Sequence, residues 1–443
     1  MPAWYLQRWE KFATKVAFIS EEATCTYADL VNFYQQAAAT LAQLQLTEPQ
    51  GFALMGDHGP VSTAWLFLLQ EQGHWVVPLS TAAGDHAEKL TQVPVHWVIQ
   101  PTATQATVVR AEVAKHDVIA TEVTALRHGL VLFSSGTSGR PKIMVQDLPN
   151  LLSRYESRRE NHLRILVLLG FDHIGGLNTL WGALAAGSTL VVVAHRAPST
   201  VLTALAKYQV NVLPASPTFL NLLVVAGEWS QYDLSALRLI TYGTEPMPPS
   251  LLERLRALLP HVRLVQTFGT TETGILQTES VSADSTFLRL VDPAVEWKVI
   301  DGELWLKSQT QIKGYFRQTS NAFTADGWFR TGDRVEQAAD GSLRILGREG
   351  ESINVGGEKL MPVEVETVLL ENSQVVDCRV YGVPNLLTGQ TVVADIVTSA
   401  TADHERLRAQ LRQLCRQRLP RYKVPTQINF VSTVSGARLK KTR

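Results

Sequence analysis

The hydrophobic residues of this chain occur in short runs that alternate with segments of helical periodicity. Residues 129–134 (GLVLFS) and 189–194 (TLVVVA) have the length and composition of buried parallel strands. Residues 249–259 repeat their apolar positions with a helical period and begin at a proline, which favours a helix N-terminus. That segment lies between two further strand candidates, residues 237–242 and 262–268. The alternation predicts an α/β protein in which helices cover mostly parallel sheets.

The pattern changes near residue 348. Residues 347–352 (GREGES) are polar and contain two glycines, which is typical of a hinge. Two helix candidates and two strand candidates follow: residues 363–371 and 403–418, and residues 375–382 and 391–397. We therefore predict a large domain over residues 1–347, a hinge at 348–351, and a small, mobile α+β domain over 352–443.

The composition is that of a folded protein without a strong electrostatic preference. The 443 residues are 45% hydrophobic and 19% charged, and 41 Lys and Arg balance 41 Asp and Glu. This balance argues against broad binding to nucleic acid or to an anionic membrane. No run approaches the roughly 18 apolar residues of a membrane-spanning helix, and no signal-peptide core follows the first residues. Three widely spaced cysteines, Cys25, Cys378 and Cys415, fit reduced thiols, so we expect a cytoplasmic protein.

A segment rich in glycine and hydroxyl groups directly follows the predicted strand 129–134. The motif runs from Phe133, near the end of that strand, to Lys142, and contains Ser134, Ser135, Gly136, Thr137, Ser138 and Gly139. Glycines let the backbone turn its N–H groups toward an anion, and the hydroxyls and the lysine add donors suited to phosphate. The Walker A pattern G-x-x-x-x-G-K-[ST] is absent. A polar surface loop is the alternative, but the spacing after a strand favours phosphate binding.

This segment resembles the phosphate loop of the adenylate-forming superfamily, which comprises acyl-CoA synthetases, adenylation domains and luciferases. The usual form is [ST]-S-G-[ST]-T-G-x-P-K-G, from which this chain departs at Ser138 and Ile143. Further segments similar to family motifs follow in the family's order: Thr26-Tyr27 with Leu30, residues 73–79, 171–176 (FDHIGG), 242–246 (YGTEP), 268–272 (FGTTE), 302–304 with 314–315, 328–333 (WFRTGD) and 347–359. The chain resembles most closely the acyl- and aryl-acid CoA ligases.

The resemblance implies a set of site residues. Lys142, His173, Thr271 and Glu272 take catalytic positions, and Glu272 also binds Mg²⁺, a hard cation that prefers oxygen ligands. The nucleotide and the thiol acceptor would contact Ser134, Ser135, Gly136, Thr137, Ser138, Gly139, Tyr242, Gly243, Thr244, Phe268, Gly269, Thr270, Asp333, Arg348, Gly356 and Gly357. We expect Asp333 in a turn after Gly332, where its carboxylate would accept from ribose hydroxyls. For His173, a buried core histidine is the alternative.

The chemistry of the superfamily explains these residue types. A carboxylate attacks the α-phosphate of ATP, pyrophosphate leaves, and the protein must align the groups and neutralise the negative charge. A thiol of CoA, or of phosphopantetheine on a carrier protein, then attacks the acyl-AMP. The resemblance implies that the small domain rotates about the hinge between these two steps. The expected partners are thus a small carboxylic acid and a thiol acceptor, with no nucleic acid and no membrane.

Three further positions depart from the family. Ala437 stands where the family usually has a lysine that bridges the acyl carboxylate and the α-phosphate. Loss of one such contact lowers the rate of adenylation by roughly 10²–10³. We favour a substituted or impaired residue there, and a natural variant that uses Arg438 or Lys440 is the alternative. Gly350 replaces the usual hinge Asp or Lys, which permits rotation but defines its end states less sharply. Asp172 takes the place of an aromatic residue, and amino-acid adenylation domains use a nearby Asp to pair with the substrate amine.

Two other functions therefore stay open beside an acid–thiol ligase. Asp172 suggests a free-standing amino-acid adenylation protein. Ala437 suggests a nucleotide-binding protein that no longer catalyses.

Overall fold

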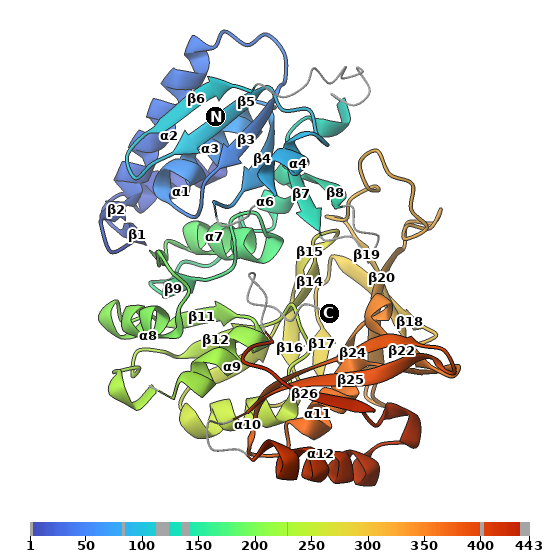
Figure 1. Cartoon of the computed structure of the whole chain (residues 1–443). Helices are drawn as coiled ribbons and strands as arrows, with labels where there is room; N and C mark the ends of the chain where they lie inside the picture. The colour runs from blue at the N-terminus through green and yellow to red at the C-terminus, as the bar shows by residue number, and fades with distance from the viewer. Residues whose placement is uncertain are drawn as a thin grey trace.

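The computed structural model describes residues 3–81, 85–111, 124–134, 141–227, 229–398 and 403–434. In the described residues, a large N-terminal domain carries three large sheets and a two-stranded hairpin, and a smaller domain with its own sheet ends the chain (Figure 1). This confirms the α/β class and the division into a large and a small part that the hydrophobic pattern predicts.

The first sheet combines the start of the chain with its middle. Its strand order is β13-β12-β11-β9-β10-β1-β2, and all neighbours are parallel except β1 and β2. The strands are β1 (Val16–Ile19), β2 (Thr24–Thr26), β9 (Arg164–Val167), β10 (Thr189–Val192), β11 (Val212–Ala215), β12 (Leu239–Tyr242) and β13 (Arg263–Gln266). The connecting helices are α7 (Ile174–Ala186), α8 (Pro198–Lys207), α9 (Pro217–Ala226) and α10 (Pro249–Leu258). Proline begins α8, α9 and α10, where its missing N–H removes no helical hydrogen bond.

The second sheet lies in the N-terminal part of the large domain. Its order is β6-β5-β3-β4-β7-β8, with four parallel inner strands and an antiparallel strand at each edge. The strands are β3 (Gly51–Met55), β4 (Trp75–Leu79), β5 (Trp97–Pro101), β6 (Ala106–Arg110), β7 (Gly129–Ser134) and β8 (Lys142–Asp147). The helices of this part are α1 (Trp4–Lys11), α2 (Tyr27–Gln43), α3 (Pro60–Glu71), α4 (His86–Leu90) and α6 (Leu148–Ser153). All five residues of β4 are buried, as expected for an inner parallel strand.

The strands within residues 268–348 are antiparallel, which the hydrophobic pattern does not predict. The strand predicted over 262–268 ends at Gln266, and Phe268 begins a separate hairpin, β14 (Phe268–Thr270) and β15 (Gly274–Leu276). A six-stranded sheet follows in the order β16-β17-β21-β20-β19-β18. Its strands are β16 (Thr278–Ser280), β17 (Leu288–Leu290), β18 (Val295–Ile300), β19 (Glu303–Ser308), β20 (Phe329–Gln337) and β21 (Leu343–Arg348). The even alternation of buried and accessible residues along β20 is typical of a sheet with one wet face.

The small domain follows a 3₁₀ turn over Glu349–Glu351, within the predicted hinge. Its sheet has the order β23-β22-β25-β24, and β26 pairs with β25. The elements are β22 (Ile353–Val355), β23 (Glu358–Leu360), α11 (Pro362–Leu369), β24 (Val375–Asn385), β25 (Gly389–Thr398), α12 (His404–Arg418) and β26 (Gln427–Phe430). Leu407, Leu411 and Cys415 repeat every four residues on α12 and face a core made only of small-domain residues. All four elements predicted beyond the hinge are thus present.

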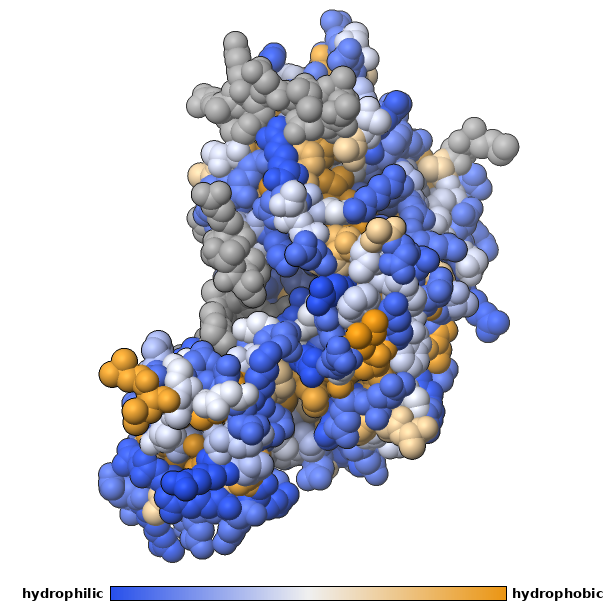
Figure 2. All heavy atoms as spheres, turned by 90° about the vertical axis from the view of Figure 1, so that its right-hand side faces the viewer, coloured by the Kyte–Doolittle hydropathy of each residue, from blue (hydrophilic) through white to orange (hydrophobic). Residues whose placement is uncertain are grey.

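Two surface observations complete the fold. Within the ranges given above, no helix is long and apolar enough to cross a membrane. On the face drawn in Figure 2, hydrophilic residues predominate and apolar residues occur in small, separate groups.

Candidate active site

The ends of the predicted phosphate loop lie opposite each other at the edge of the second sheet. Ser134 ends β7 and pairs with Lys142, the first residue of the antiparallel strand β8. The residues between them, Ser135, Gly136, Thr137, Ser138 and Gly139, lie outside the described residues. Their contact with phosphate therefore remains a prediction from the sequence.

Lys142, Tyr315 and Glu272 form a row of polar side chains. The ammonium of Lys142 lies 3.5 Å from the Tyr315 hydroxyl and 4.8 Å from the centre of its ring. That hydroxyl donates to Glu272 Oε1 over 2.8 Å, and both Tyr315 and Glu272 are buried. Burial, followed by the charge of Glu272, raises the pKa of Tyr315, so the phenol stays protonated and acts as a donor.

The β14–β15 hairpin presents Glu272 from its turn. A side chain at Gly269 would lie 2.6 Å from the carbonyl oxygen of Gly274, so only glycine lets the two strands approach this closely. Thr270 Oγ1 lies 3.0 Å from Thr273 Oγ1 across the turn, and the carbonyl of Thr271 accepts from the Gln146 amide. These contacts place Thr270, Thr271 and Glu272 together, beside the end of β8.

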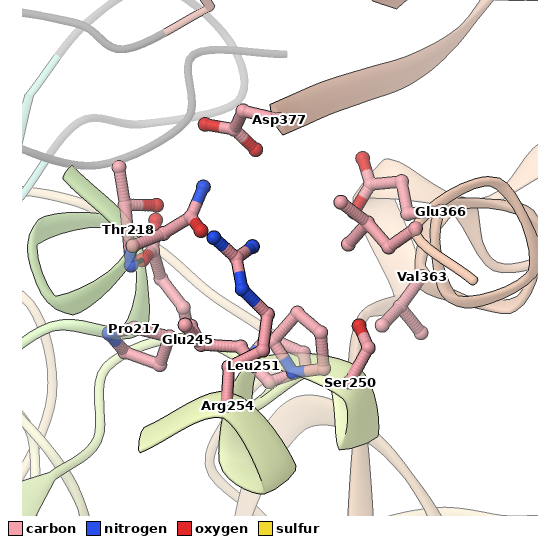
Figure 3. Close-up of a pocket in the computed structure, with 13 residues that line it drawn as sticks. Pro217, Thr218, Glu245, Ser250, Leu251, Arg254, Val363, Glu366 and Asp377 are labelled. Carbon is pink, nitrogen blue, oxygen red and sulfur yellow. Dashed lines mark hydrogen bonds between the residues drawn. The ribbon is translucent and has the colours of Figure 1, made fainter. Parts of the chain in front are cut away.

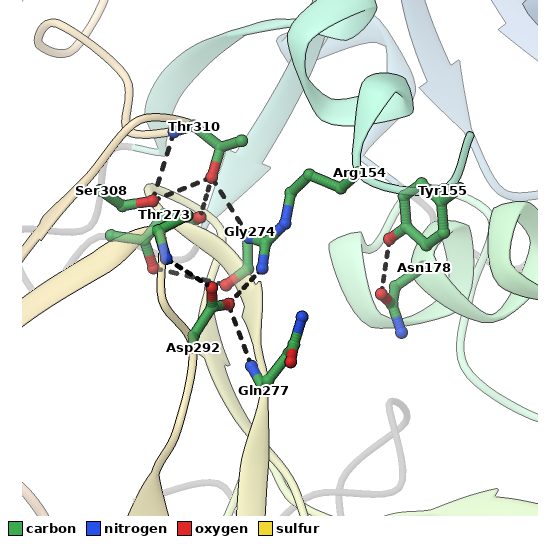
Figure 4. Close-up of polar contacts among 10 residues, drawn as sticks. Arg154, Tyr155, Asn178, Thr273, Gly274, Gln277, Asp292, Ser308 and Thr310 are labelled. Atoms are coloured by element: carbon green, nitrogen blue, oxygen red, sulfur yellow. Dashed lines mark hydrogen bonds and ion pairs between the residues drawn. The ribbon is translucent and has the colours of Figure 1, made fainter. Parts of the chain in front are cut away.

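An ion pair between a buried carboxylate and a half-buried arginine anchors this hairpin to the rest of the large domain (Figure 4). The carboxylate of Asp292 pairs with Arg154, which follows α6, and also accepts the N–H of Gln277 over 3.1 Å. Thr310 Oγ1 donates to the carbonyl of Thr273 over 2.8 Å. Each partner comes from a different segment, so the turn with Glu272 is fixed by more than its own backbone.

Asp333 and Arg348 lie opposite each other on β20 and β21. The prediction of a turn at Asp333 is wrong, because this residue pairs in register with Arg348 inside an antiparallel sheet. Arg348 Nε lies 2.7 Å from Asp333 Oδ1. The Asp333 N–H donates to Thr331 Oγ1 over 2.9 Å, which holds the strand beside the positive-φ residue Gly332. Asp333, a family motif residue, and Arg348, which ends β21 and begins the predicted hinge, are thus joined directly.

The second carboxylate oxygen of Asp333 is buried and has no hydrogen-bond partner among the described residues. Burial raises the pKa of Asp333 to about 6, against the lowering effect of Arg348, and the charge of Glu272 raises it further. The charge of Asp333, followed by that of Glu272, raises the pKa of Arg348 in turn. The charge of Glu272 thus acts on both Asp333 and Arg348, and we treat the two groups of side chains as one candidate site. An unsatisfied buried acceptor fits a ligand that carries hydroxyl donors.

The segment predicted to contact adenine follows β12. The ring of Tyr242 is buried in the hydrophobic core, which raises its pKa to about 12, so the ring does not line an open site. Thr244 has a φ of +72°, a left-handed conformation that is uncommon for a residue with a side chain. Such backbone strain often marks a functional position, and Thr244 is exposed here, whereas Gly243 beside it is buried.

His173 is the N-cap of α7. Its ring Nδ1 accepts the N–H of Gly175 over 3.4 Å, and the helix begins at Ile174. The residue is neither fully buried nor fully exposed, so the core-histidine alternative is not what the structure has. A role toward the substrate carboxylate remains a prediction.

The remaining predicted residues lie in or after the small domain. Gly356 and Gly357 both have positive φ, and they form the exposed turn between β22 and β23. The Gly356 N–H donates to the carbonyl of Thr388 over 2.8 Å, within the same domain. Ala437, Arg438 and Lys440 lie outside the described residues.

The sequence-based site omitted Tyr315, the residue that connects Lys142 to Glu272. The motif Gly314-Tyr315 marked its position, but only the fold brings it beside Lys142, through a bridge between Tyr315 and Met144. A motif gives a position without giving the partner of its side chain.

Comparison with known families agrees with this arrangement. Residues 6–316 match the AMP-binding enzyme family, and residues 364–443 match the AMP-binding enzyme C-terminal domain. The chain belongs to the AMP-binding enzyme family. The resemblance to adenylate-forming enzymes is thereby confirmed, and such an enzyme activates an acid as acyl-AMP before passing it to a thiol.

Relatives are found along the whole chain. An indoleacetate–CoA ligase of Aromatoleum aromaticum is 27% identical over 97% of this chain and 94% of its own length. Acyl-CoA synthetase 7 of Caenorhabditis elegans is 30% identical over 68% of this chain and 61% of its own length. A 2-succinylbenzoate–CoA ligase of Bacillus pumilus is 26% identical over 97% of this chain and 94% of its own length.

Solved structures share the fold. An anthranilate CoA ligase in complex with anthranoyl-AMP has a TM-score of 0.82 at 20% identity, over 99% of this chain and 95% of that one. An amide bond synthetase from Marinactinospora thermotolerans has a TM-score of 0.80 at 24% identity, over 99% of this chain and 97% of that one.

Proposed function

We propose that this enzyme activates a small aromatic carboxylic acid with ATP and Mg²⁺ and then transfers the acyl group to the thiol of CoA. The observation that carries the proposal is that motif residues far apart in the sequence contact one another in two groups. Lys142, Tyr315 and Glu272 form one, and Asp333 with Arg348 forms the other. A phosphate-binding loop end, a metal-binding carboxylate and a ribose acceptor are the groups that adenylation requires at one place.

Each group has a defined part in the first step. The substrate carboxylate attacks the α-phosphorus, a P–O bond forms, and the bond to pyrophosphate breaks. Lys142 and the loop before it offset the charge on the phosphates, while Asp333 Oδ2 accepts from a ribose hydroxyl and holds the nucleotide in line. Since no side-chain nucleophile takes part, orientation and charge account for the rate.

The donor set fits a metal ion that arrives with the nucleotide. Mg²⁺ is usually bound by one or two carboxylates together with substrate phosphates. In the part of the chain that the structure describes, no group of three or more His, Cys, Asp or Glu side chains could hold a metal by itself. Glu272 would therefore be the protein ligand, and the phosphates would supply the others. When bound, Mg²⁺ would neutralise phosphate charge.

The names of the relatives support the acid and the acceptor. The relatives that align over almost their full length are described as indoleacetate–CoA and 2-succinylbenzoate–CoA ligases, which act on acids with an aromatic ring. A carrier-protein phosphopantetheine is the alternative thiol. For the second step we propose the domain limits given above, with residues 1–347 and 352–443 turning about 348–351.

A reducing compartment is also part of the proposal. Cys25, Cys378 and Cys415 are buried and form no disulfide, which supports the expected cytoplasmic location.

The test is a substrate panel of aromatic, fatty and amino acids with ATP and MgCl₂. Acid-dependent release of pyrophosphate and formation of a CoA thioester are measured, with a pantetheine-loaded carrier protein as second acceptor. Aromatic acids should give both products. Turnover with amino acids alone would support an amino-acid adenylation protein, and ATP binding without acid-dependent release would support a non-catalytic one. The Ala437→Lys variant is run in parallel, so that slow adenylation is not mistaken for none.

A further inference from the structure

The two domains meet at a pocket whose lining does not include Lys142, Tyr315 or Glu272. Helices α9 and α10 form its large-domain side, while α11 and the beginning of β24 form the other (Figure 3). Its lining includes Asn221, Arg254 and Glu245 from the large domain and Glu366 and Asp377 from the small one. Charged groups of both domains thus face a common space.

One hydrogen bond joins the domains directly across this interface. Asn221 on α9 is buried, and its Nδ2 donates to the carbonyl oxygen of Val376 over 3.1 Å. Val376 is the extra residue of a β-bulge, because Val375 pairs with Thr398 and Asp377 with Val397. A bulged residue leaves the ladder of its sheet, so its carbonyl is available to a partner outside the domain.

Arg254 adds charge complementarity to this contact. Its guanidinium extends from α10 into the pocket, toward the side where Asp377 and Glu366 lie (Figure 3). Burial lowers the pKa of Arg254, and no described residue forms an ion pair with it. The two small-domain carboxylates are held by their own backbone, since Glu366 accepts from Val380 N and Asp377 from Cys378 N. Both carboxyl groups line the pocket on the side opposite a large-domain cation.

The position of the glycine turn indicates which of two arrangements this is. Gly356 and Gly357 are exposed, and no atom lies within 4 Å of the place where a Gly357 side chain would begin. Within the described ranges, the turn's hydrogen bonds go to Asn354 and Thr388 of its own domain. The turn is therefore not on the large domain while the α9–α10 surface contacts β24. Thiol transfer, in which the turn is expected at the site, needs another arrangement.

We propose that Asn221 and Arg254 are positioning residues that hold the small domain in the acid-activating arrangement, Asn221 by its hydrogen bond and Arg254 by its charge, and that the Asn221–Val376 hydrogen bond breaks before thiol transfer. This inference rests on the proposed function.

If the two arrangements exchange faster than either half-reaction, each rate scales with the population of one arrangement. The ratio of transfer rate to adenylation rate then follows the equilibrium between them, and a lost contact changes that ratio whichever state predominates.

The two half-reactions are measured separately in single-turnover experiments on the full chain. Acid-dependent pyrophosphate release reports adenylation, and thioester formation from supplied acyl-AMP and CoA reports transfer. In Asn221→Ala the ratio of transfer to adenylation should rise about fivefold, the factor for one lost hydrogen bond. Arg254→Glu places like charges opposite Glu366 and Asp377 and should raise it further, whereas Arg254→Lys should leave it close to the parent value.

Arg256→Ala is the matched control. Arg256 lies on the same helix as Arg254 but pairs with Asp284 of the large domain. The ratio of transfer rate to adenylation rate in Arg256→Ala should therefore equal that of the parent. If Asn221→Ala and Arg254→Glu lower both half-reactions equally, the residues are merely structural, and the inference is wrong. An unchanged ratio in both variants would overturn it as well.

A distance measurement tests the inference without catalysis. Lys207 on α8 and Glu405 on α12 are exposed, and the native cysteines are buried, so cysteines at these two positions accept spin labels selectively. The parent should give one main label–label distance, and Arg254→Glu a second population. Identical distance distributions would contradict the inference. If no acid is activated while the distances respond, the proposed function fails and the positioning role stands.

Discussion

Tyr315 donates to Glu272 over 2.8 Å, and the same tyrosine separates that carboxylate from the ammonium of Lys142. Without the tyrosine, the buried carboxylate would have the lysine as its natural partner, and an ion pair would occupy both groups. The phenol satisfies Glu272 as a neutral donor instead. A hydrogen bond to a neutral hydroxyl is exchanged for a metal ion more easily than a buried ion pair, so this order of groups keeps Lys142 and Glu272 ready for different ligands.

The first prediction concerns Glu272 as a metal ligand. Glu272→Gln removes a charge with little change in size and should lower Mg²⁺-dependent formation of acyl-AMP about 10²-fold. Tyr315→Phe keeps the carboxylate and should have a smaller effect. Glu279→Gln, at an exposed position on β16, is the control. Measured rates of acyl-AMP formation that are equal for Glu272→Gln and the parent would remove Glu272 from the metal site.

The second prediction is a pH dependence of nucleotide binding. Burial raises the pKa of Asp333 to about 6, so its carboxyl is neutral below that pH and charged above it. A ribose hydroxyl donates to the charged form, and binding of ATP should therefore weaken as the pH falls through about 6. Calorimetric titrations of the enzyme with ATP, repeated at intervals of roughly one pH unit between pH 5 and 8, test this prediction.

Two variants separate Asp333 from other titrating groups. Asp333→Asn should bind ATP weakly with no transition near that pH. Arg348→Ala removes the nearest cation, which should move the transition to higher pH. A transition that survives in Asp333→Asn belongs to another residue.

The third prediction concerns the glycine turn of the small domain. Gly357 has a φ of +93°, and alanine there should slow thiol transfer from supplied acyl-AMP about tenfold, because the added methyl group would narrow the path of the thiol. Adenylation should be unaffected. Gly341→Ala is a matched control, since Gly341 also has a positive φ and no atom within 4 Å of an added side chain. Equal loss of transfer in both variants would attribute the effect to backbone strain alone.

The fourth prediction concerns the anchor of the hairpin that carries Glu272. Arg154→Ala leaves the buried carboxylate of Asp292 without its cation and should lower the free energy of unfolding by about 3 kcal/mol. Chemical denaturation measures this change. Arg289→Ala breaks a pair with Asp340 in which both side chains are nearly half exposed, and should have little effect. Similar changes in the two variants would mean that the buried pair contributes no more than a surface one.

The sequence predicts those strands that appear as a continuous run of apolar residues. The run at residues 129–134 becomes β7 and that at 189–194 becomes β10, because both strands are covered on two faces and need apolar side chains throughout. The antiparallel strand β20 alternates buried with accessible residues along its length, so the criterion of a continuous apolar run does not predict it.

The partners of the site residues depend on register, which no local pattern contains. Motifs mark both Asp333 and Arg348, yet their ion pair requires the antiparallel alignment of β20 with β21. Asn221 has no motif, and its contact with Val376 arises from a bulge in a strand of the other domain. Sequence reasoning thus finds chemical groups more reliably than the distances between them.

The last prediction concerns Ala437, which lies outside the described residues and is argued from the sequence. The surrounding segment, Ser435-Gly436-Ala437-Arg438-Leu439-Lys440, keeps the family pattern around a missing lysine. Only adenylation needs a cation between the substrate carboxylate and the α-phosphate, so a change at this position should affect one half-reaction. Ala437→Lys should raise acyl-AMP formation by about 10²-fold or more, the usual effect of one charge-stabilising contact. The rate at which supplied acyl-AMP is converted to thioester should stay the same.

The control is Ala437→Met, whose side chain is similar in length to lysine but carries no charge, and its adenylation rate should equal that of the parent. Equal adenylation rates for the lysine variant and the parent would refute the prediction, and alanine substitutions at Arg438, Lys440 and Lys441 would then identify the cation in use.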